Sequence, residues 1–172
     1  MTTLRDALLV EQSKRQTFMI KTYVRIQQER FDELVALFLG DEYLVTQHAA
    51  GILGYVGKVN PRFLLKHLKD LIYNLQNDVP VAVKRNTLRV LQYVDIPEEL
   101  QGVLTEICFE FLHSASEPIA VKVFSMTVLG NICKKYPELK HELILSIEAQ
   151  LPFASAGFRA RAKKVLKKLS KL

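Results

Sequence analysis

The chain has 172 residues, 49% of them hydrophobic and 24% charged, a composition typical of a folded protein that is long enough to bury a core. Its apolar runs are far shorter than the roughly 18 residues of a membrane-spanning helix, and it starts without a secretory signal, so a cytoplasmic protein with no membrane partner is expected. The net charge of +6 is uneven, because residues 1–158 carry 17 basic and 18 acidic residues whereas residues 159–172 carry seven basic residues and no acidic ones.

Residues 1–28 are predicted to be helical, but they do not follow the pattern of the rest of the chain. Leu4 and Leu8 begin one apolar face, and Val24 belongs to another that follows a polar stretch. Ser13 and Gln16 have the spacing of a capping box at the start of a second helix, and the alternative is one long helix. In either case we expect an N-terminal cap that shields the first face of a repeat array.

Four later stretches repeat one pattern at intervals of 37 or 38 residues. Each has apolar or small residues at i, i+4, i+7, i+8 and i+11, a spacing that falls on one face of an α-helix. In chain order, the positions are Val45, Ala49, Ile52, Leu53 and Val56; Val83, Thr87, Val90, Leu91 and Val94; Val121, Ser125, Val128, Leu129 and Ile132; and Phe158, Ala162, Val165, Leu166 and Leu169. The pattern predicts four helices that each bury an equivalent stripe.

A further apolar helical stretch precedes each of these helices, which predicts four helical hairpins at about 29–58, 61–95, 97–136 and 137–172. Gly40 and Asp41 predict a helix end followed by an N-cap inside the first hairpin. All six prolines lie at or next to predicted helix boundaries, where a missing N–H is tolerated. We therefore expect one domain, residues 1–172, with an all-α fold: an α-solenoid of about four hairpins behind an N-terminal helix or helix pair.

Residues suited to catalysis or metal binding are scattered. The four histidines stand apart without an HExxH motif, and Cys108 and Cys133 lack ligand spacing, which predicts reduced core thiols. Acidic pairs such as Asp32 and Glu33 lie near predicted helix starts, where acids complement the helix dipole. The sequence predicts no catalytic residues, no metal and no cofactor, and therefore no enzyme.

The second helix of each hairpin resembles that of the HEAT repeat family, which typically reads as an acid, then valine with a basic residue, then a small residue, then leucine often followed by glycine. The matching residues are Asp41, Val45, Ala49, Leu53 and Gly54; Asp78, Val83, Lys84, Thr87 and Leu91; Glu117, Val121, Lys122, Ser125, Leu129 and Gly130; and Phe158, Arg159, Ala162 and Leu166. The resemblance covers about residues 29–172. It implies an armadillo-type solenoid whose second helices line a concave side.

Charged residues recur within this pattern. We expect Lys84, Lys122 and Arg159 to form a structural ladder across repeats with the acids of the turns, Asp41, Asp78 and Glu117. Their equivalent places in successive repeats favour a structural role over a binding role.

The outward positions of the second helices are the candidate binding surface. A projection at 100° per residue places Arg85, Arg89 and Gln92 opposite the buried stripe, with Lys164 and Lys167 at equivalent places in the last repeat and Lys134 one turn beyond the third. Such a surface would be mixed at one end and basic at the other.

The interpretation that we favour is a non-enzymatic scaffold or adaptor that binds a protein, with an acidic or extended segment along these residues. The resemblance leaves two alternatives, a nucleic-acid-binding protein related in architecture to the DNA-alkylation-repeat glycosylases and a lyase or enzyme-maturation factor. A second copy of the chain is a further partner to consider. The absence of tryptophan and the near-neutral first 158 residues argue against nucleic acid.

Overall fold

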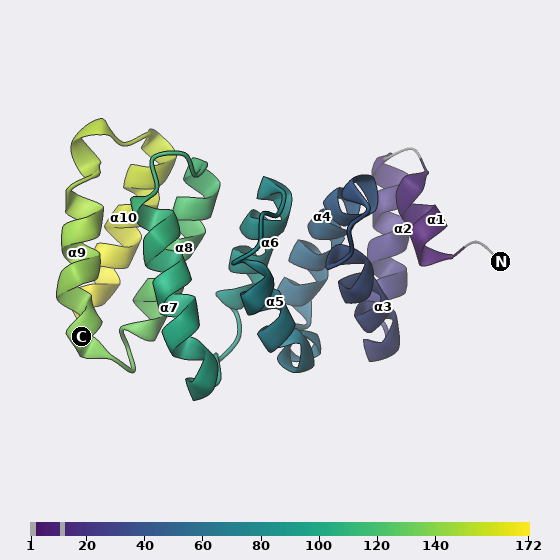
Figure 1. The fold of residues 1–172 in the computed structure, drawn as a ribbon, viewed down its shortest axis with the longest axis horizontal. Helices are drawn as coiled ribbons and strands as arrows, with labels where there is room; N and C mark the ends of the chain where they lie inside the picture. The colour runs from purple at the N-terminus through teal and green to yellow at the C-terminus, as the bar shows by residue number, and fades with distance from the viewer. Residues whose placement is uncertain (1–2, 11–12) are drawn as a thin grey trace. The chain divides into compact units, whose positions relative to one another are not determined.

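The computed structural model describes residues 3–10 and 13–172, and these residues form ten α-helices and three short 3₁₀-helices with no strand (Figure 1). Residues 1, 2, 11 and 12 of the predicted N-terminal cap lie outside the described residues. The chain packs into two compact units, residues 1–95 and residues 96–172. The all-α fold class is confirmed, and a single domain over residues 1–172 stays a prediction.

The N-terminal cap consists of two helices, α1 (Leu4–Leu9) and α2 (Lys14–Val24). The side-chain oxygen of Ser13 accepts a hydrogen bond from the Gln16 backbone at 3.0 Å and so starts α2. The Gln16 side chain does not close a capping box, because its amide donates to the Ala7 carbonyl at 3.0 Å and ties α2 to α1. Both helices pack against the first hairpin, as a cap requires.

The first unit contains two hairpins. The first is α3 (Gln28–Phe38) with α4 (Tyr43–Val59), and the second has a 3₁₀-helix (Pro61–His67), α5 (Leu68–Asn74) and α6 (Val81–Leu91). Helix α4 is central, since α3 and α6 both pack against it. Its N-cap is Glu42 rather than the predicted Asp41, and the Glu42 carboxylate accepts a 2.7 Å hydrogen bond from the Arg5 Nε. The helix boundary is therefore shifted by one residue.

The start of the second hairpin differs from the prediction. Residues 61–67 form a 3₁₀-helix with three residues per turn, so Pro61, Leu64 and His67 share one face. Leu64 is buried, but Leu65 lies off that face and is 54% exposed.

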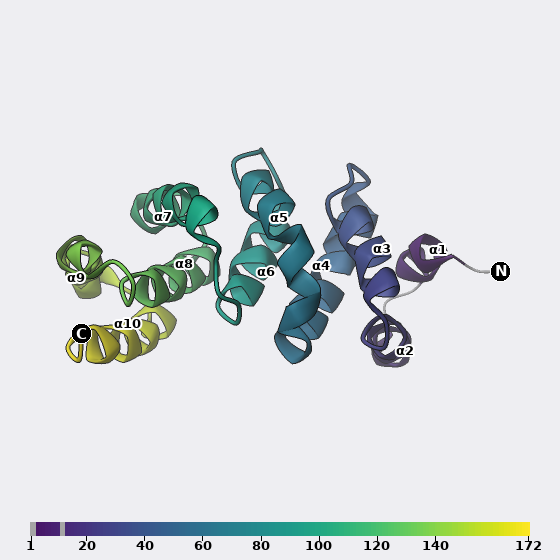
Figure 2. The same cartoon turned by 90° about the horizontal axis from the view of Figure 1, so that it is seen from below.

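The second unit contains α7 (Glu98–His113), α8 (Ile119–Ile132), α9 (Lys140–Glu148) and α10 (Ala156–Leu169), with short 3₁₀-helices at Pro137–Leu139 and Leu151–Phe153. Helices α7 and α10 both pack against α8, and α9 packs against α8 and α10 (Figure 2). All six prolines lie at or next to the start of a helix, as predicted.

The repeated stripe is buried. Of its positions, only Val94 and Leu166 are half-buried, and every other one is buried in the core of its unit. Val94 lies beyond the end of α6, which explains its partial exposure. The period of the sequence therefore identified the packed face of all four second helices.

Candidate functional site

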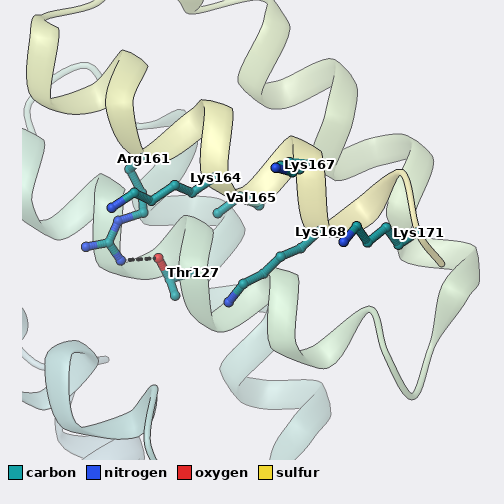
Figure 3. A pocket seen from close by; sticks show the side chains of 7 residues that line it. All are labelled: Thr127, Arg161, Lys164, Val165, Lys167, Lys168 and Lys171. Atoms are coloured by element: carbon teal, nitrogen blue, oxygen red, sulfur yellow. Dashed lines mark hydrogen bonds between the residues drawn. The ribbon is translucent and has the colours of Figure 1, made fainter.

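A basic groove in the second unit is the candidate site. It has a volume of about 510 Å³ and lies between α8, which contributes one side chain, and α10, which contributes five, while Lys171 just beyond the end of α10 contributes the last (Figure 3). The residues that line it are Thr127, Arg161, Lys164, Val165, Lys167, Lys168 and Lys171. Five of these seven side chains are cationic and none is acidic.

Three features of the sequence favour the helix α10: its N-cap, its composition and its apolar face. The Ser155 side chain accepts a hydrogen bond from the Phe158 backbone at 3.3 Å and caps the first turn. Alanine, arginine, lysine and leucine, which fill most of the helix, have high helix propensity. Its buried residues are Phe158, Ala162, Val165 and Leu169, so the lysines are left on the outer faces.

A glycine allows α8 and α10 to approach closely beside the groove. A Cβ atom added at Gly130 of α8 would lie 3.2 Å from the Val165 Cγ1, tighter than ordinary van der Waals contact. Val165 therefore packs directly over the backbone of α8 and forms the apolar floor of the groove.

Arg161 is held in place, unlike the exposed lysines around it. Its Nη1 donates a 2.7 Å hydrogen bond to the Thr127 Oγ1 (Figure 3). Its guanidinium carbon lies 5.8 Å from the centre of the Phe124 ring. The Thr127 hydroxyl in turn donates to the Val123 carbonyl at 3.0 Å, so its proton is directed away from Arg161. The half-buried guanidinium is thus preorganised at one end of the groove.

The lysines of α10 repel one another. Lys164 and Lys168 are four residues apart on the helix, where like charges are destabilising. An anion seated in the groove would relieve this repulsion, so the groove is suited to a ligand with several negative charges.

A family model described as a HEAT repeat domain matches residues 4–169. The chain belongs to the HEAT repeat family. The match extends to the cap helices α1 and α2, whereas the resemblance in the sequence began at about residue 29. A search of curated proteins and a search of solved structures found no significant match. Members of the family are helical repeat scaffolds, commonly for protein interaction.

In this HEAT repeat protein, two of the predicted binding residues lie at the same site, because Lys164 and Lys167 both line the groove. Lys134 is exposed after the end of α8 but is not part of the lining. The sequence projection did not give Arg161, Lys168 or Lys171 as site residues. The signal for them was present, because residues 159–172 contain seven basic residues and no acid.

The other predicted binding residues lie in the first unit. Arg85 is exposed on α6, and Arg89 is half-buried, with its Nη1 3.7 Å from the position of a Cβ added at Gly54 of α4. Gln92 is the C-cap of α6, and its amide donates to the Arg89 carbonyl at 3.1 Å. Among these three side chains, Arg85 is the most accessible to a partner.

Two members of the predicted structural ladder form hydrogen bonds within the second unit. The Lys122 ammonium donates to the Gln150 side chain at 3.1 Å, which joins α8 to the following hairpin, and the Arg159 guanidinium donates to the Pro152 carbonyl at 3.4 Å. Asp41 and Asp78 are exposed, while Lys84 and Glu117 are half-buried. The ladder of ion pairs with turn acids stays a prediction.

Sequence reasoning also missed a polar cluster in the first unit. The Asp32 carboxylate accepts hydrogen bonds from Gln28 at 2.7 Å and from Lys66, and His67 lies 2.6 Å from it. Burial alone would raise the pKa of Asp32, but the hydrogen bonds from Lys66, Gln28 and His67 outweigh it and lower the pKa to about 2. The cluster ties α3 to the 3₁₀-helix.

The two cysteines, Cys108 and Cys133, are both buried. Desolvation raises the pKa of the Cys108 thiol to about 12 and raises that of Cys133, as expected of core thiols. Among the described residues, no group of three or more His, Cys, Asp or Glu side chains is placed to hold a metal ion. The helices of the same residues include none that is both long and apolar enough to cross a membrane.

Proposed function

We propose that this HEAT repeat protein is a non-enzymatic scaffold or adaptor that binds an acidic segment of a partner protein in the groove between α8 and α10. The observation that carries the proposal is the lining of that groove, five cationic side chains and no acid around an apolar floor. Family membership supports a scaffold role, since helical repeats offer extended surfaces for partners.

The energetics fit a reversible interaction. An exposed ion pair contributes about 0.2–1 kcal/mol, so several pairs along α10 add up to modest affinity. Val165 and the aliphatic stems of the lysines supply apolar contact beneath the charges. Because the lysines are exposed, the affinity is expected to fall steeply with ionic strength.

Nucleic acid is the second candidate, because lysines also neutralise phosphates. The groove lining contains no aromatic side chain on which a base would stack. Its cations on α10 span residues 161–168, about 10 Å along the helix at 1.5 Å per residue, which is short for a duplex-binding surface. These features favour a protein segment.

Fluorescence anisotropy separates the two candidates. The probes are a labelled acidic peptide of about 15 residues and a labelled DNA duplex, each titrated at about 0.05 M and about 0.3 M salt. We expect the peptide to bind at low salt, and the double variant Lys164→Glu/Lys168→Glu to lose about tenfold or more in affinity. The matched control Lys135→Glu/Lys163→Glu changes the net charge equally at exposed residues outside the lining and should retain binding.

Two results would reject the proposal. Tighter binding of the duplex than of the peptide would favour nucleic acid, and equal losses in the two double variants would indicate a general charge effect instead of a groove. An Arg85→Glu/Arg89→Glu variant measured in the same way tests whether the outward residues of the first unit contribute to binding, as predicted from the sequence.

A further inference from the structure

The cations of the groove follow the period of an α-helix. Arg161, Lys164 and Lys168 occupy positions i, i+3 and i+7 of α10, and Lys167 lies beside them, whereas Lys171 follows the end of the helix. At 1.5 Å per residue, the Cα atoms of the first three residues are successively about 4.5 and 6 Å apart along the helix axis. The side chains of Arg161, Lys164 and Lys168 extend on the side of α10 where Thr127 lies (Figure 3).

We infer that the partner segment bound in this groove is an acidic amphipathic α-helix, a deepening that rests on the proposed function. A helix with Asp or Glu at i, i+3 and i+7 has the same axial spacing as Arg161, Lys164 and Lys168, so one carboxylate faces each of these three cations. An extended segment has same-side residues about 6.7 Å apart, so its charges do not stay aligned with the cations of α10 over the same length.

The shape and rigidity of the groove agree with a helical ligand. Val165 supplies an apolar floor between the cations, which is the arrangement in which an amphipathic helix lies in a groove. Arg161, fixed by its 2.7 Å hydrogen bond to Thr127, loses little freedom when it pairs with the first carboxylate. The lysines adjust to the remaining carboxylates because they are exposed and flexible.

The test compares three labelled peptides of about 15 residues. One has glutamates at i, i+3 and i+7 of an alanine- and leucine-rich helix, the second has the same residues in scrambled order, and the third exchanges one central alanine of the first for proline. We expect the first peptide to bind the protein about tenfold more tightly than either of the others and to gain helical circular dichroism on binding. Thermal unfolding of each protein variant checks that it is folded.

Protein variants identify where the peptide binds. Arg161→Ala and Lys168→Ala should each weaken binding of the first peptide, whereas Lys163→Ala on another face of α10 should leave it unchanged. Equal affinities for the first and scrambled peptides would overturn the helical ligand while leaving the proposed function in place. If none of the three peptides binds, the proposed function fails as well.

Discussion

Thr46 and Thr87 are both buried in the second helices of the first unit, but their hydroxyls have different surroundings. The Thr46 hydroxyl donates to the Gly40 carbonyl at 3.2 Å, whereas the Thr87 oxygen has no hydrogen-bond partner among the described residues. Thr87→Val should therefore raise the free energy of unfolding by up to about 1 kcal/mol, while Thr46→Val lowers it by about 1 kcal/mol. Urea unfolding midpoints measure both changes, and shifts in the same direction would contradict this difference in hydrogen bonding between the two hydroxyls.

Asp32 makes stability depend on pH in the acidic range. Its pKa in the folded protein is about 2, below the ordinary 3.8, so its stabilisation is present above pH 3.8 and is lost as pH falls toward 2. We expect Asp32→Asn to lower the free energy of unfolding by about 1 kcal/mol near neutral pH, after allowance for solvent screening.

Urea unfolding at a series of pH values tests this expectation. The difference between wild type and Asp32→Asn should shrink between pH 3.8 and about 2. Glu33→Gln is the control, because Glu33 is the exposed neighbour of Asp32. A pH-independent difference for Asp32→Asn would mean that the carboxylate charge is not what stabilises the cluster.

At the level of elements, the glycines of α4 determine how closely other segments pack against it. A Cβ added at Gly57 would lie 2.9 Å from the Val90 Cγ1 of α6 and 3.2 Å from the Leu64 Cδ1, whereas one added at Gly51 meets nothing within 4 Å. Gly57→Ala should therefore destabilise the protein by about 1–2 kcal/mol through overpacking. Gly51→Ala should stabilise it by about 0.5–1 kcal/mol through helix propensity. Thermal unfolding of the pair measures the contrast, and stabilisation by both would show that α6 can move away from α4.

The same elements show what the sequence can predict. The buried stripe was predictable because the helical period is local, and a run such as Val121 to Ile132 contains its own signal. The contact between Asp32 and His67 was not predictable, because no local sequence pattern joins residues that are 35 positions apart. The projection gave Lys164 and Lys167, which line the groove, but not Arg161, whose position depends on its bond to Thr127 of α8.

At the scale of the whole molecule, residues 1–95 and 96–172 each have a core of their own. Hydrogen exchange of the Gly57→Ala variant in mild denaturant should therefore show reduced protection mainly in amides of residues 1–95. Amides of α7 to α10 should keep most of their protection, because neighbouring contacts dominate the stability of repeat proteins. A uniform loss of protection across the chain would show that the two cores unfold as one.

The burial of Cys108 and Cys133 has a practical consequence for experiments on the intact chain. Both thiols are almost inaccessible and have raised pKa values, so they should react slowly with maleimide dyes. A cysteine introduced at exposed Glu33 and another at exposed Lys163 would then be labelled selectively without removing the native ones. Energy transfer between the two dyes would report how far apart the two units lie in solution, with and without a bound peptide.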